Sequence, residues 1–101
     1  MSISLISGMV QTLNAYQERL NKIAQNTANA LTEGYRPLET LFREDSAGGV
    51  RAETRAMKQE DIVDLSREMT DKIAVESGYK AAVSVIKTEQ ETMRALLDIH
   101  T

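Results

Sequence analysis

Hydrophobic positions recur every three or four residues over two long segments, one near each end of the chain. In the first segment, from Ser4 to Leu31, apolar or small residues keep a strict alternation of three and four steps over four heptads. This spacing places them on one face of an α-helix and is typical of helices that pair with another helix. The positions of this first seam are Ile6, Met9, Leu13, Tyr16, Leu20, Ile23, Thr27 and Ala30.

Breaker residues predict where the first helix ends. Gly34 suits the left-handed residue that closes a helix, and Pro37 prevents the helix from continuing. A serine at position 2 or 4 is a suitable N-cap. We therefore expect residues 1–34 to form an N-terminal helix.

The second segment, from Asp61 to about Ile99, has a less regular seam. Polar residues interrupt it at Lys72 or Glu76 and at Gln90. Asp61 is the predicted N-cap of a C-terminal helix over residues 61–101. Its seam positions are Ile62, Leu65, Met69, Ile73, Tyr79, Val83, Ile86, Met93 and Leu97.

Residues 35–60 form a short connection whose structure the pattern fixes only in part. Leu38, Leu41 and Phe42 fit either a short helix or a strand, whereas Ser46 to Gly49 is a clear turn signal. Val50 to Ala56 alternates small or apolar with charged residues, which is the pattern of a half-exposed strand. We expect a small irregular segment or β-hairpin, which is barely stable in isolation.

These elements predict an all-α protein built from two long antiparallel amphipathic helices around that small connection. With 101 residues, two paired helices do not enclose a core as a compact globule does. Their remaining apolar surface predicts an oligomeric helical bundle, formed between copies of the chain.

Composition and charge exclude several classes of partner and site. The 12 basic and 15 acidic residues give a net charge of −3 without any basic block, which disfavours nucleic acid and anionic membranes. The absence of cysteine excludes disulfides, thiolate metal sites and a cysteine nucleophile. The first ten residues lack the positive charge of a signal peptide, and no stretch approaches the roughly 18 to 20 apolar residues of a membrane span.

The chain offers little for catalysis or metal binding. Its one histidine, His100, is next to the last residue. The acidic residues that lie close to one another in the sequence match no metal-binding spacing. We therefore predict no enzyme, no catalytic residue, no cofactor and no metal.

The amides of the first helix either form a solvated face or hydrogen-bond to neighbouring helices. Gly78, inside the second helix at a cost of about 1 kcal/mol, is either a tolerated small residue or a point where another backbone approaches.

The end of the first helix resembles the signature near the N-terminus of bacterial flagellar axial proteins, the rod and hook family. That signature reads roughly Asn-Ile-Ala-Asn-x-Asn-Thr-x-Gly-Tyr, and Leu31 here replaces an Asn while Glu33 stands where Pro is common. The matching residues are Asn26, Ala28, Asn29, Thr32, Gly34 and Tyr35.

A second similarity lies in the C-terminal helix. Val63 to Leu65, Glu68 to Met69, Tyr79, Ala82 and Ile86 to Thr88 through Leu97 resemble the C-terminal helix of the same family. Gly49 to Ala52 is similar to the strand after the first helix in distal rod and hook members. The chain resembles a short member of the family, because its middle segment holds little beyond one hairpin.

The resemblance implies a structural subunit of the flagellar basal-body rod or hook. Its terminal helices would pair and form the inner tube of a filament with other copies and other axial proteins. Export would use the flagellar type III apparatus without a cleaved signal peptide, and the destination would be the periplasm-spanning rod. The predicted helix seam within one subunit is Ile6, Leu13, Leu20, Ile23, Leu65, Met69, Val83, Ile86 and Met93. The predicted contacts between subunits are Asn21, Gly78 and Tyr79.

A second hypothesis explains the heptads equally well. A cytoplasmic coiled-coil adaptor or export chaperone would bind the helix of another protein in its groove. This hypothesis leaves the match from Asn26 to Tyr35 unexplained.

Overall fold

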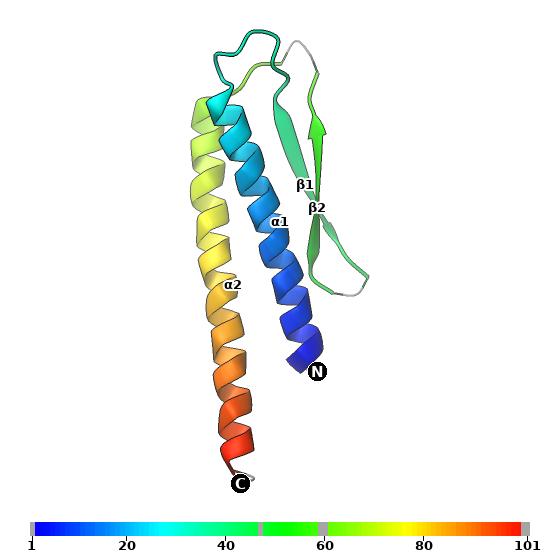
Figure 1. Ribbon diagram of the computed structural model, residues 1–101, viewed down its shortest axis with the longest axis vertical. Coiled ribbons are helices and arrows are strands. Elements are labelled where there is room, and N and C mark those ends of the chain that lie inside the picture. Colours follow the sequence, from blue (N-terminus) through cyan, green and yellow to red (C-terminus); the bar gives the residue numbers. More distant parts are fainter. Residues whose placement is uncertain (1, 47, 59–60, 100–101) are drawn as a thin grey trace.

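The computed structural model describes residues 2–46, 48–58 and 61–99, without the side chains of residues 2–4. Its elements follow the order helix, strand, strand, helix (Figure 1). They are α1 (Ser2–Ala28), β1 (Leu38–Glu44), β2 (Val50–Ala56) and α2 (Leu65–Ile99). The two helices run antiparallel, and the hairpin lies beside α1 (Figure 1). The molecule is elongated, at 63 × 25 × 14 Å.

The expectation of an all-α fold is wrong, because the connection is a regular two-stranded antiparallel sheet. The strands pair over seven positions, from Leu38 opposite Ala56 to Glu44 opposite Val50. Gly48 and Gly49 close the turn with φ values of 92° and 85°, which residues with a Cβ rarely adopt. The chain therefore has a mixed helix and strand architecture, with a hairpin between its helices.

The hairpin is stable because α1 covers one of its faces. Phe42 of β1 packs edge to face on Tyr16, with the ring centroids 5.6 Å apart, and the guanidinium of Arg19 lies 4.9 Å from the Phe42 ring centre. Near the turn, the Val50 amide donates to the Thr12 hydroxyl at 3.1 Å. A two-stranded ribbon alone lacks these apolar and polar contacts.

Beside the seam, a second stripe on α1 contributes to this contact through Gly8, Thr12, Arg19 and Asn26. Its residues are small or polar and also alternate by four and three steps. Glycine is needed near the hairpin turn, because a Cβ on Gly49 would collide with the backbone of Gly8. The stripe residues are Gly8, Thr12, Ala15, Arg19, Lys22 and Asn26.

Both helix ends at the loop side differ from the expected boundaries. α1 stops at Ala28, where the Asn29 side chain donates to the Gln25 carbonyl at 3.0 Å. α2 begins at Leu65 with Asp64 as its cap, whose carboxylate accepts the Arg67 amide at 3.1 Å. The predicted cap at Asp61 is wrong, because that carboxylate accepts the Lys58 amide in the preceding turn.

Candidate functional site

Asn26 is the centre of the most densely hydrogen-bonded point in the fold, and its side chain is only 1% exposed. Its amide nitrogen donates to the Leu38 carbonyl at 2.8 Å and to the Glu68 carboxylate at 2.9 Å. Its amide oxygen accepts the Leu38 amide at 2.8 Å and the Tyr35 hydroxyl at 2.7 Å. One side chain therefore joins the end of α1, the following loop, the start of β1 and the start of α2. We call Asn26, Tyr35, Leu38 and Glu68 the junction.

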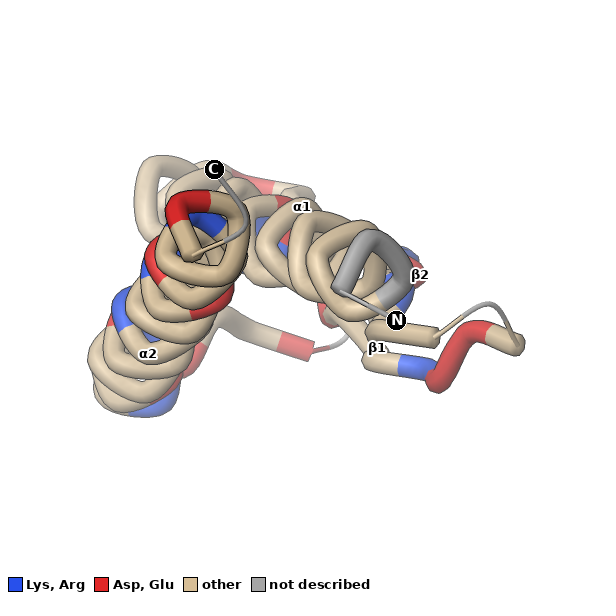
Figure 2. Tube along the Cα trace, turned by 90° about the horizontal axis from the view of Figure 1, so that it is seen from below, with Lys and Arg blue, Asp and Glu red and all other residues tan. Residues whose placement is uncertain are grey.

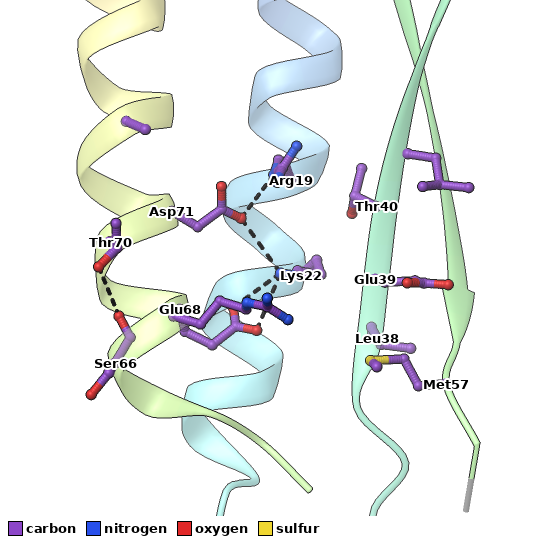
Figure 3. Close-up of a pocket in the computed structure, with 13 residues that line it drawn as sticks. Arg19, Lys22, Leu38, Glu39, Thr40, Met57, Ser66, Glu68, Thr70 and Asp71 are labelled. Atoms are coloured by element: carbon purple, nitrogen blue, oxygen red, sulfur yellow. Dashed lines mark hydrogen bonds and ion pairs between the residues drawn. The ribbon is translucent and has the colours of Figure 1, made fainter. Parts of the chain in front are cut away.

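A buried ion pair extends the junction along the α1–α2 interface. Lys22 donates to both oxygens of Glu68 at 3.2 and 3.1 Å, and both residues are buried. Asp71 lies 3.5 Å from the Lys22 ammonium and accepts a hydrogen bond from Arg19 at 2.8 Å. Figure 3 shows these four charged side chains converging between the helices. Two cations face two anions, so the cluster is electrically balanced, which burial of charge requires.

Burial raises the pKa of Tyr35 above its usual 10.0, and the negative charge of Glu68 raises it further. The phenol therefore remains protonated at neutral pH and donates to Asn26. This protonation state suits a structural hydrogen bond.

The buried polar side-chain atoms of the junction are satisfied within the chain. Among the residues described, every buried polar side-chain atom has a hydrogen-bond partner. A cavity of about 680 Å³ lies beside the junction, between the hairpin and α2, with Leu38, Thr40 and Met57 along one wall (Figure 3). Within the described ranges no three His, Asp or Glu side chains converge in a way that suits a metal ion. His100 lies outside the described residues.

The six residues of the flagellar signature have different surroundings. Asn26 and Tyr35 belong to the junction. Asn29 and Thr32 bond to each other at 3.2 Å in the exposed turn after α1, and Gly34 follows with φ at 78°. Ala28 lies at the surface.

The predicted helix seam is only partly enclosed. Ile23 is buried, while Leu65 and Met69 are 48% and 59% exposed. The buried positions of α2 are instead Glu68, Val75 and Ala82, spaced by seven residues. This spacing is a heptad pattern. A search for large apolar side chains misses it, because Glu68 is charged and Ala82 is small. The seam residues of intermediate exposure are Ile6, Leu13, Leu20, Val83, Ile86 and Met93.

The predicted contacts between subunits have different positions within the single chain. Asn21 is exposed and accepts a hydrogen bond from Gln17 at 3.2 Å. Gly78 faces Tyr16, since an added Cβ would lie 3.3 Å from that ring. The close approach at this glycine is therefore a side chain of α1 from the same chain. Tyr79 is half-buried beside Leu20.

An apolar groove of about 490 Å³ runs between the helices on the side away from the hairpin. We call it the helix groove. Its α1 wall is formed by Leu20, Ile23, Ala24, Thr27 and Ala28, and its α2 wall by Met69, Lys72 and Glu76. The helix groove opens to the surface of the molecule.

No protein-family model and no curated protein matches the chain. In the part of the chain that the structure describes, neither helix is long and apolar enough to cross a membrane.

Proposed function

We propose that this chain is a structural subunit of the bacterial flagellar basal-body rod or hook, which assembles through its paired terminal helices. The observation that carries the proposal is the signature from Asn26 to Tyr35, together with the separate similarity in the C-terminal helix. Two of the signature residues, Asn26 and Tyr35, bond to each other and tie α1 to α2. The signature thus coincides with the point that holds the two terminal helices together.

The exposed surface supports an assembly role. Large apolar side chains are exposed along α2 and at the loop end, where Leu31 and Ile62 are 99% and 85% exposed. Contiguous exposed apolar surface is typical of proteins that bind other proteins. On this proposal the partners are other copies, other axial proteins and the flagellar export apparatus, and the chain reaches the rod without a cleaved signal peptide.

A cytoplasmic adaptor or export chaperone is the second candidate, which the open helix groove favours. Cell fractionation separates the two functions. An axial subunit copurifies with basal bodies, whereas an adaptor stays in the cytoplasmic fraction. Recovery only from the cytoplasm would exclude the rod proposal.

A substitution on the helix seam tests the assembly step. Leu20 is half-buried at the helix groove, so Leu20→Asp places a charge against apolar surface and should abolish folding or assembly. A strain with this variant should lose motility, while Asn14→Asp at an exposed position of α1 should leave it intact. Normal motility with Leu20→Asp would contradict assembly through this seam.

A further inference from the structure

At the C-terminal end of α2, large apolar side chains are exposed among the residues that the structure describes. α2 has 35 residues and α1 has 27, and Figure 1 shows α2 reaching past the N-terminal end of α1. In this overhang, residues 93–99, Leu96, Leu97 and Ile99 are 55%, 64% and 77% exposed. Leu97 is 28 residues from Met69 of the helix groove, which is about 42 Å along one continuous helix. The overhang therefore reaches a helix groove only in another molecule.

One flank of α2 carries charges at helical spacing from the groove to the overhang. Lys72 and Glu76 form its start, where they pair at 2.6 Å and stay about half exposed. Arg94 and Asp98 repeat that spacing on the overhang with the same order of signs, so the two pairs become complementary when one helix is turned antiparallel to the other. Figure 2, a view along the helices, shows both signs distributed along α2 and the hairpin beside α1.

We propose that two copies of this chain form a two-fold dimer in which the overhang of each lies on the helix groove of the other. The α2 helices run antiparallel, with Arg94 opposite the partner copy's Glu76 and Asp98 opposite its Lys72. Because the contact is reciprocal, each such pair occurs twice. The exposed leucines of the overhang cover the apolar α1 wall of the helix groove.

Charge fixes the register of this dimer. A shift of one helical turn in one direction brings Arg94 to Lys80 and Asp98 to Glu76, and a shift the other way brings Arg94 to Lys72. Like charges in these positions repel, whereas the proposed register pairs opposite charges.

The handedness of the helix fixes the direction. On α2 the charged flank lies clockwise from the face that packs on α1, viewed from its N-terminus. When the overhang of one copy lies antiparallel in the helix groove of the other, its charged flank faces the α2 wall of that groove, where Lys72 and Glu76 lie. A parallel α2 would turn it to the apolar α1 wall. This dimer does not depend on the proposed role in the flagellum.

Disulfide trapping of the full chain tests the arrangement, since the protein has no native cysteine. An equimolar mixture of Lys72→Cys and Asp98→Cys chains should oxidise to a disulfide-linked heterodimer far faster than either variant alone. A mixture of Lys80→Cys and Asp98→Cys should not. Preferential linkage of the second mixture would place Asp98 beside Lys80, through parallel helices or a register two turns away, and would overturn the proposal. Equal linkage in all samples would overturn it as well.

Charge reversal gives a measurement that does not rely on cysteine. Glu76→Arg and Arg94→Glu should each weaken the dimer by about tenfold or more in sedimentation equilibrium, because each creates two like-charge contacts. The double variant should return to wild-type affinity. Arg51→Glu, on the exposed hairpin, is the matched control and should have no effect. A monomeric wild-type chain, or a double variant no better than the singles, would refute the dimer, provided that circular dichroism shows folded protein.

Discussion

Replacing Asn26 by leucine should destabilise the fold more than any other single amide substitution in α1. Leucine fills a similar volume but makes none of the four hydrogen bonds at distances of 2.7 to 2.9 Å. The amide and carbonyl of Leu38 then lose their partner, at about 1–3 kcal/mol for each buried group. Because Leu38 is only partly buried, we expect a loss of about 2–4 kcal/mol. Against a typical total of about 5–15 kcal/mol this is a large fraction.

Urea unfolding at a fixed protein concentration, followed by circular dichroism, measures this loss. With a slope of about 1–3 kcal/mol per molar urea, the midpoint should fall by about 1–2 M. Asn21→Leu, at an exposed position of the same helix, is the control and should stay within about 0.5 kcal/mol of wild type. Equal midpoints for Asn26→Leu and Asn21→Leu would refute the assignment of the junction as the point that holds the helices together.

Asn26→Asp tests the direction of the hydrogen bonds. Aspartate keeps the acceptor for Leu38 and Tyr35 but lacks the amide donor, and its charge lies beside Glu68. The repulsion raises the pKa of the new carboxyl in the folded state, so protonation of that carboxyl stabilises the folded variant. Its deficit relative to wild type should therefore shrink as pH falls from 8 towards 5. A deficit that grows over this range would contradict the proposed geometry.

Three further outcomes follow from the packing and the junction. Gly78→Val should lower the free energy of unfolding by about 1–3 kcal/mol, because the new side chain clashes with the tyrosine ring of α1. Ala81→Val, on the exposed face of α2, is the control and should cost less than about 1 kcal/mol. Equal losses in the two variants would contradict the close contact at Gly78. Gly49→Ala should release the hairpin and speed amide exchange of the strands, because its Cβ meets the α1 backbone, while Gly34→Ala, with a similar positive φ but open space, should not. The raised pKa of Tyr35 contributes stability that is fully present below about pH 10 and is lost as pH rises through the folded value. Alkaline absorbance titration of the wild type should show a late phenol component that is lost in Tyr35→Phe. Identical titrations of the two proteins would contradict the raised pKa of Tyr35.

The helices and the hairpin turn are readable from the sequence because each has a local signal. Heptad spacing identifies α1 and α2, and Gly48 with Gly49 identifies the turn. The strand over Val50–Ala56 has its alternating pattern, whereas β1 has none that excludes a helix. Its strand structure depends on pairing with β2 and on the contact of Phe42 with α1, both of which are tertiary.

The junction was not predictable from periodicity. Asn26 and Glu68 are 42 residues apart, and a polar pair at that separation has no local pattern. The stripe of small and polar residues on α1 was hidden for a similar reason, since apolar periodicity ignores glycine, threonine and lysine. The family resemblance marked Asn26, Tyr35 and Glu68 of the junction, but it did not show that they bond to one another.

The most direct measurement of the proposed role is the protein content of purified hook–basal bodies. Quantitative mass spectrometry of these particles should detect this chain at a fixed stoichiometry to the known rod subunits. A strain that carries Leu20→Asp should lack it there. Its absence from intact wild-type particles, with the protein present in the cytoplasm, would contradict the account.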